Sequence, residues 1–106
     1  MNNFIKEIKI NKIIHEPARL LIMTIIASRI NKKISFNELK EISQLSSGNL
    51  SIQLKNLEEA SYVIITKSIK NKKTYTEIEI TKIGENALEE YLNEIEKIIK
   101  LYKKEI

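Results

Sequence analysis

Three local patterns follow each other between residues 36 and 81, and their order restricts what this chain can fold into. Residues 36–42 have the spacing of a short amphipathic helix and are followed by a serine-rich break at 43–48. A second amphipathic segment covers 49–60, and two β-branched runs then flank the basic turn 70–73. The chain is therefore expected to be mostly α-helical with one small β-hairpin, an α+β fold.

Capping signals and apolar spacing place the helices. Pro17 suits the first turn of a helix, where its missing N–H has no partner to lose, and a helix is expected from Pro17 to Arg29. Ser35 precedes Glu38 by three residues, the spacing of a capping box at the start of a helix over 36–43. Ser46 or Ser47 can cap the next helix. The side chains expected to face inward are Leu20, Leu21, Ile25 and Ile26, then Leu39 and Ile42, then Leu50, Leu54 and Leu57.

The β-type runs cover 62–69 and 74–81, and the second alternates strictly between charged and apolar side chains. The four-residue turn between them contains Asn71, which tolerates a positive φ. A third short strand is expected over 34–36. Helix, tight turn, helix and basic hairpin is the order of a winged helix-turn-helix, in which the second helix enters the major groove of DNA.

The two outer segments carry more apolar surface than a small domain can cover. Residues 3–14 suggest a short amphipathic helix or arm, and 82–106 form the longest helix, with one continuous apolar stripe. The stripe can pack within the chain, but we favour pairing with a second copy in a homodimer, because an exposed patch of this size is unusual for a monomer. The side chains of the expected dimer interface are Phe4, Ile5, Ile8, Leu88, Tyr91, Leu92, Ile95, Ile98, Ile99 and Tyr102.

The charge is unevenly distributed along the chain. The net charge is +4, but Ile, Lys and Asn make up 48 of the 106 residues, and all three have A/T-rich codons, so part of the excess reflects composition. The distribution is more informative: residues 1–33 sum to +5 and 61–84 to +3, whereas 34–60 and 85–106 each sum to −2. Such segregation gives one face a positive potential that can follow phosphates.

Several function classes are disfavoured. The chain has no Cys and one histidine, His15, which we assign to the start of the first helix, so neither a metal centre nor a nucleophile–base pair is expected. Gly48 and Gly84 are the only glycines, which excludes a glycine-rich phosphate loop. No apolar run approaches the roughly 18 residues of a membrane span. We expect one soluble, cytoplasmic, non-enzymatic domain over 1–106 without a cofactor; the sequence does not indicate an effector.

Five segments, taken in order, resemble the small archaeal and bacterial winged-helix DNA-binding domain proteins, which are relatives of the MarR-like and ArsR-like regulators. They are His15–Leu20, Phe36–Leu39, Leu45–Leu50, Leu54–Ala60 and Ile80–Gly84. The resemblance implies that the helix over 47–60 reads the major groove, that the hairpin over 62–81 is the wing, and that the outer helices pair in a homodimer.

Three departures from the family pattern affect that expectation. Ser61 stands where the family usually has glycine, between the second helix and the wing. The wing turn contains lysines but neither Arg nor Gly, so insertion of an arginine into the minor groove is not expected. Lys55 is the single cation of the second helix, so affinity would depend on the wing and on contacts at the helix terminus.

The expected function is that of a sequence-specific, homodimeric transcriptional regulator that binds double-stranded DNA. Asn and Gln can pair bidentately with adenine, and Ser with a phosphate or a base. The alternative is a winged-helix module that binds another protein without sequence-specific DNA binding. The expected DNA contacts are Ser46, Ser47, Gly48, Asn49, Ser51, Ile52, Gln53, Lys55, Asn56, Lys70, Asn71, Lys72 and Lys73.

Overall fold

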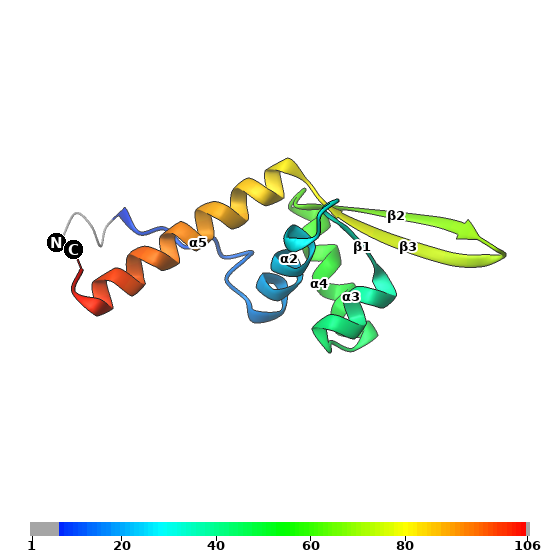
Figure 1. The fold of residues 1–106 in the computed structure, drawn as a ribbon, viewed down its shortest axis with the longest axis horizontal. Helices are drawn as coiled ribbons and strands as arrows, with labels where there is room; N and C mark the ends of the chain where they lie inside the picture. The colour runs from blue at the N-terminus through cyan, green and yellow to red at the C-terminus, as the bar shows by residue number, and fades with distance from the viewer. Residues whose placement is uncertain (1–6, 106) are drawn as a thin grey trace.

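The computed structural model describes residues 7–105 and has the predicted α+β architecture of a winged helix-turn-helix that ends in a long helix (Figure 1). A three-stranded antiparallel sheet has the strand order β1-β3-β2. No helix within the described residues is both long and apolar enough to cross a membrane. The elements are α2 (Pro17–Ser28), β1 (Lys33–Ser35), α3 (Phe36–Ser43), α4 (Ser47–Glu59), β2 (Val63–Lys70), β3 (Lys73–Ile80) and α5 (Lys82–Lys103).

The molecule is elongated, with extents of 59 × 24 × 24 Å. Its radius of gyration is 16.1 Å, whereas a compact domain of this length would have about 13 Å. The difference comes from two projections in opposite directions: the β2–β3 hairpin at one end and α5 at the other (Figure 1). Helices α2, α3 and α4 lie between them and enclose the core together with the base of the sheet.

Side-chain caps start each helix. Ser35 Oγ accepts from the backbone N–H of Glu38 at 3.1 Å, Ser46 Oγ caps α4 in the same way, and Thr81 Oγ1 caps α5. Only half of the predicted capping box forms, because the Glu38 carboxylate pairs with Arg29 instead of turning back to Ser35. The start of α2 is capped by the Glu16 carboxylate.

His15, which was assigned from sequence to the start of this helix, lies just before α2 but does not cap it. Its Nδ1 lies 2.8 Å from the hydroxyl of Tyr91, and the two rings meet at a centroid distance of 5.8 Å. This contact joins the start of α2 to the middle of α5.

The core confirms the predicted face of α4 and, of the four α2 side chains predicted to be buried, only Ile26. Leu50, Leu54 and Leu57 are no more than 2% exposed. In α2 the buried set is Ala18, Ile22, Met23 and Ile26, whereas Leu21 is 41% exposed, and Leu20 and Ile25 are only half-buried. Apolar residues surround most of α2, so their spacing did not identify one face; contacts with α4, α5 and β3 select it.

Ile42 was also expected to face inward, but 49% of it is exposed. Helix α3 is only eight residues long and ends at Gln44, whose φ of 62° turns the chain. Leu39 and Ser43, four residues apart, form its buried face. Ile42 therefore lies at the side of α3.

The hairpin follows the predicted alternation, with Ile78 and Ile80 buried. Its turn is tighter than predicted, because Lys70 pairs with Lys73 and only Asn71 and Lys72 form the loop. Both have a positive φ, of 51° and 64°, as two-residue hairpin turns require to match strand twist. The short strand predicted over 34–36 is β1, one residue earlier.

The N-terminal segment is an arm rather than a helix over Ile8–Ile14. It runs alongside α5, where the backbone N–H of Lys9 donates to the Glu94 carboxylate at 3.4 Å (Figure 1). The Asn11 amide donates to the Tyr62 hydroxyl at 2.9 Å, and Ile14 is fully buried. Two members of the expected dimer interface, Phe4 and Ile5, lie outside the described residues.

The first half of α5 packs on the core through Leu88 and Tyr91, which are 6% and 4% exposed. These two side chains, which were expected at a dimer interface, are therefore buried within the chain itself. Gly84 allows the close approach, because a Cβ atom there would overlap the carbonyl oxygen of Tyr62.

Gly84→Ala is expected to lower the free energy of unfolding by about 1–3 kcal/mol, since backbone would have to shift to relieve the clash. Gly48→Ala is the matched control: nothing lies within 4 Å of its added Cβ. That variant should be neutral or gain up to about 1 kcal/mol from helix propensity. Urea denaturation of both variants measures the difference; equal stabilities would contradict the assigned packing of α5.

Candidate nucleic-acid interface

Helix α4 presents a continuous polar arc because its three leucines hold the opposite arc against the core. Of the nine predicted contact residues on or beside α4, eight are exposed and Gln53 is half-buried. The eight are Ser46, Ser47, Gly48, Asn49, Ser51, Ile52, Lys55 and Asn56. The structure therefore brings the predicted residues of α4 together on one accessible surface.

Two members of this set differ from the others, one in its structural role and one in its chemistry. The Ser46 hydroxyl accepts from the backbone N–H of Asn49 at 3.1 Å as the cap of α4, so its first role is structural. Ile52 is an exposed apolar side chain (62%) within the polar arc. Such a side chain suits contact with a thymine methyl group.

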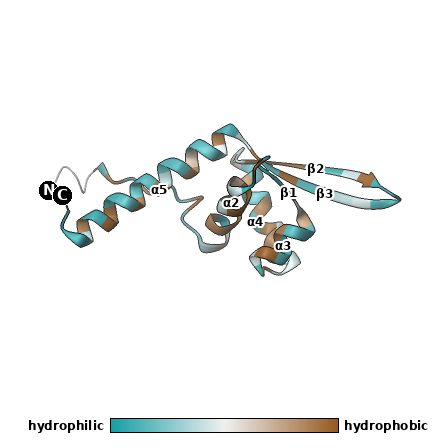
Figure 2. Cartoon of the chain, viewed as in Figure 1, coloured by the Kyte–Doolittle hydropathy of each residue, from teal (hydrophilic) through white to brown (hydrophobic). Residues whose placement is uncertain are grey.

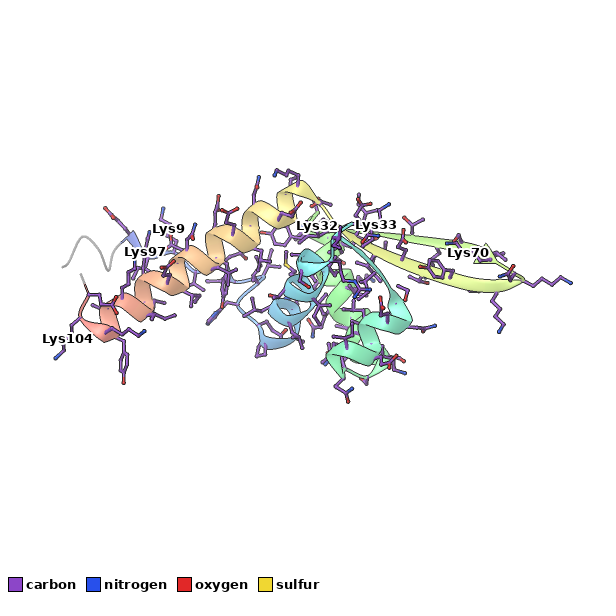
Figure 3. The ribbon with its side chains drawn as sticks, viewed as in Figure 1. Lys9, Lys32, Lys33, Lys70, Lys97 and Lys104 are labelled. Carbon is purple, nitrogen blue, oxygen red and sulfur yellow. The ribbon has the colours of Figure 1, made fainter. Side chains whose placement is uncertain are left out.

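The hairpin supplies the cationic part of the surface. Lys70, Asn71, Lys72 and Lys73 are all exposed at its outer end, and Figure 3 shows Lys70 near this end. Lys70 Nζ lies 4.1 Å from the centroid of the Tyr75 ring, a cation–π contact that orients this side chain across the outer face of the hairpin. None of the ion pairs within residues 7–105 involves a hairpin lysine.

Other lysines are placed differently. Lys9, Lys97 and Lys104 lie toward the far end of α5 (Figure 3), and Lys97 pairs with Glu94 at 3.2 Å. Lys100 lies 3.8 Å from Glu96 on the same helix. Within residues 7–105, acidic neighbours thus offset these two lysines of α5, whereas the lysines of the hairpin have no acidic partner.

A groove of about 670 Å³ separates α4 from the hairpin. Lys67 lines it from β2 opposite Lys55 and Ser51 of α4, and was missed by the sequence analysis. The signal was strand alternation: Lys67 shares a strand face with Val63 and Ile65, which point toward the core. The full lining is Phe36, Ser51, Leu54, Lys55, Glu58, Ile65, Lys67 and Thr76.

Arg19, from α2, contacts α4 on the side away from this groove and was also missed. Its Nη1 donates to Gln53 Oε1 at 2.7 Å, and Gln53 Nε2 donates to Asn49 Oδ1 at 3.0 Å. No sequence signal links residues 19 and 53, because the contact depends on how α2 crosses α4.

Residues 7–105 hold no group of three or more His, Cys, Asp or Glu side chains suited to a metal ion.

The family model of the winged helix DNA-binding domain matches residues 18–99. The match covers most of the chain, including α4 and the hairpin, and the chain belongs to this family. The family confirms the resemblance expected from the five sequence segments.

The chain is also similar to one protein in sequence and to two solved structures in fold. The uncharacterized protein MJ0432 of Methanocaldococcus jannaschii is 43% identical over 60 residues, which are 57% of this chain and 65% of that protein, just under two thirds of its length. The transcriptional regulator homologue protein from Pyrococcus horikoshii OT3 has a similar structure, with a TM-score of 0.79 and 28% identity over 92% of this chain and 95% of that chain. The YusO protein from Bacillus subtilis shares the fold, with a TM-score of 0.70 and 15% identity over 98% of this chain and 68% of that chain.

Proposed function

We propose that this protein is a homodimeric transcriptional regulator that binds double-stranded DNA sequence-specifically, with α4 in the major groove and the hairpin on the adjacent backbone. One observation carries the proposal: the exposed polar arc of α4 lies across a groove from a hairpin whose lysines have no acidic partner within residues 7–105. The similar protein from Pyrococcus horikoshii, described as a transcriptional regulator homologue, supports the regulatory role.

The division of roles follows from side-chain chemistry. Lysine binds phosphate as a point charge and carries no sequence information, whereas amide side chains distinguish base edges in the major groove. Lys67, Lys70, Lys72 and Lys73 are therefore assigned to the backbone, and the amides of α4 to the bases. Ser47 and Gly48, in the first turn of α4, place backbone N–H groups where a phosphate can bind at the helix N-terminus.

The homodimer is proposed from the second half of α5. Leu92, Ile98, Ile99 and Tyr102 are 47%, 40%, 46% and 86% exposed, and they continue the stripe that Leu88 begins in the core. Figure 2 shows hydrophobic segments among hydrophilic ones along the part of α5 that projects beyond the domain. Ile8 and the half-buried Ile95 complete the proposed surface. A two-fold dimer would place two copies of α4 about 34 Å apart, facing the half-sites of a near-palindromic operator.

The first test is the salt dependence of duplex binding. If a dimer neutralises about 6–8 phosphates, log K should fall with log salt at a slope of about −5 to −7. Fluorescence anisotropy with a labelled duplex between 50 and 300 mM KCl, on the order of the physiological range, measures the slope. A flat response would favour the alternative function, a winged-helix module that binds another protein.

The second test separates contacts with the phosphate backbone from contacts with the bases. Lys67→Ala or Lys72→Ala should weaken cognate and random duplexes equally, because both lose a phosphate contact. Asn56→Ala should cost about 1–3 kcal/mol on the cognate duplex alone. Lys100→Ala, on α5, is the control for loss of a positive charge and should bind both duplexes normally. Identical behaviour of the lysine and asparagine variants would refute the placement of α4.

The third test concerns assembly. Ile99→Asp with Tyr102→Asp should give a monomer with intact winged-helix structure and much weaker operator binding, because charges would be buried at the proposed interface. Asn86→Asp with Asn93→Asp, exposed on the other side of α5, adds the same charge and should stay dimeric. Light scattering reports the mass and circular dichroism the fold. A dimer that persists in the first variant would exclude this interface.

A further inference from the structure

We propose that Arg19 is a positioning residue that sets the hydrogen-bonding direction of α4, so that Asn49 presents its N–H donors to a base edge and selects guanine. The proposal rests on the proposed function, because it assigns a preference to one base position of the same DNA surface. Its basis is the chain of hydrogen bonds from Arg19 through Gln53 to Asn49.

Arg19 fixes the direction of both hydrogen bonds in this series. A guanidinium group has only donors, so Gln53 must turn its carbonyl oxygen toward Arg19. The NH₂ end of the Gln53 amide then faces Asn49, at 3.0 Å from Oδ1. Asn49 must in turn point its oxygen at Gln53, which leaves its own NH₂ group directed away from the protein.

Arg19 is well held for this role. Its backbone N–H donates to the Glu16 carboxylate at 2.8 Å, and its Nε donates to the carbonyl oxygen of Ile13. Arg19 and Gln53 are half-buried, whereas Asn49 is exposed. The chain is therefore fixed at its α2 end and accessible at the end that faces the proposed DNA.

The consequence differs from the adenine contact that amide side chains suggest from sequence alone. A bidentate pair with adenine needs both the oxygen and the NH₂ group of one amide. The Gln53 oxygen is turned toward Arg19 and the Asn49 oxygen toward Gln53, so neither amide is oriented for that pair. Guanine presents two acceptors, N7 and O6, in the major groove, whereas cytosine presents an N4 donor. The NH₂ group of Asn49 therefore favours guanine and disfavours cytosine.

Gln53→Glu provides the sharpest test, because it reverses the direction of the hydrogen bond to Asn49 while keeping the shape of the side chain at position 53. A carboxylate accepts from Arg19 and also offers an acceptor to Asn49. Asn49 must then turn its NH₂ group inward and its oxygen outward, which favours the cytosine N4 donor. Selection from randomised duplexes measures the preference, and the position read by Asn49 is the one whose preference Asn49→Ala removes.

We expect the guanine-over-cytosine ratio at that position to fall by about tenfold or more in Gln53→Glu. Asn56→Asp adds the same negative charge on the same helix and should lower overall affinity without changing that ratio. An unchanged ratio in Gln53→Glu would overturn the inference.

A measurement without DNA tests the chain directly. In ¹⁵N-labelled protein, Arg19→Leu and Asn49→Ala should each shift the side-chain NH₂ signals of Gln53, and Asn56→Ala should leave them unchanged. Gln53 signals that are the same in Arg19→Leu and the wild type would overturn the inference even if the protein binds DNA. Wild-type protein that binds no duplex would instead overturn the proposed function, and the base preference with it. The NH₂ signals would still show whether the hydrogen bonds from Arg19 through Gln53 to Asn49 form.

Discussion

The arrangement of this molecule depends on the burial of three leucines in α4. Leu50, Leu54 and Leu57 are almost fully enclosed by the core, and a fully buried leucine contributes about 1.5–3 kcal/mol relative to an exposed one. Rotation of α4 by even a fraction of a turn would expose at least one of them. The same packing therefore holds the fold together and determines which side chains of α4 meet the solvent.

The hairpin is attached to this helix by a short and constrained connection. Ala60 ends α4, and Ser61 has a φ of 66°, in the left-handed region that glycine adopts at little cost. Ser61 thus keeps the left-handed backbone conformation at this position, although it replaces the glycine that favours that conformation. The chain then enters β2 at the buried Val63, so α4 and the hairpin are positioned by adjacent parts of one core.

Local rules explain how much could be predicted. The capping serines, the leucine spacing of α4 and the alternation of β3 are each determined within a few residues, and all three were predicted from sequence. The face of α2 could not be, because apolar residues occupy most of its circumference and only tertiary contacts choose among them. Arg19 was missed for a related reason: a sequence pattern can show that a residue is charged but not which surface the fold brings it to. Lys67 was missed although the alternation of β2 places it on the strand face of Val63 and Ile65. The burial of Leu88 and Tyr91 depends likewise on where α5 crosses the core.

Tyr62 joins three parts of the molecule that are distant in sequence. Its hydroxyl accepts from Asn11 of the arm, its carbonyl oxygen accepts from the backbone N–H of Thr81 at 2.9 Å, and its backbone fits against Gly84 at the start of α5. The hairpin that begins one residue later has eight residues per strand and is about 26 Å long. Both α5 and the hairpin are attached at Tyr62. A tilt of the hairpin by about 10° there would displace the lysines at its tip by roughly 4–5 Å, nearly the spacing between neighbouring strands of a sheet.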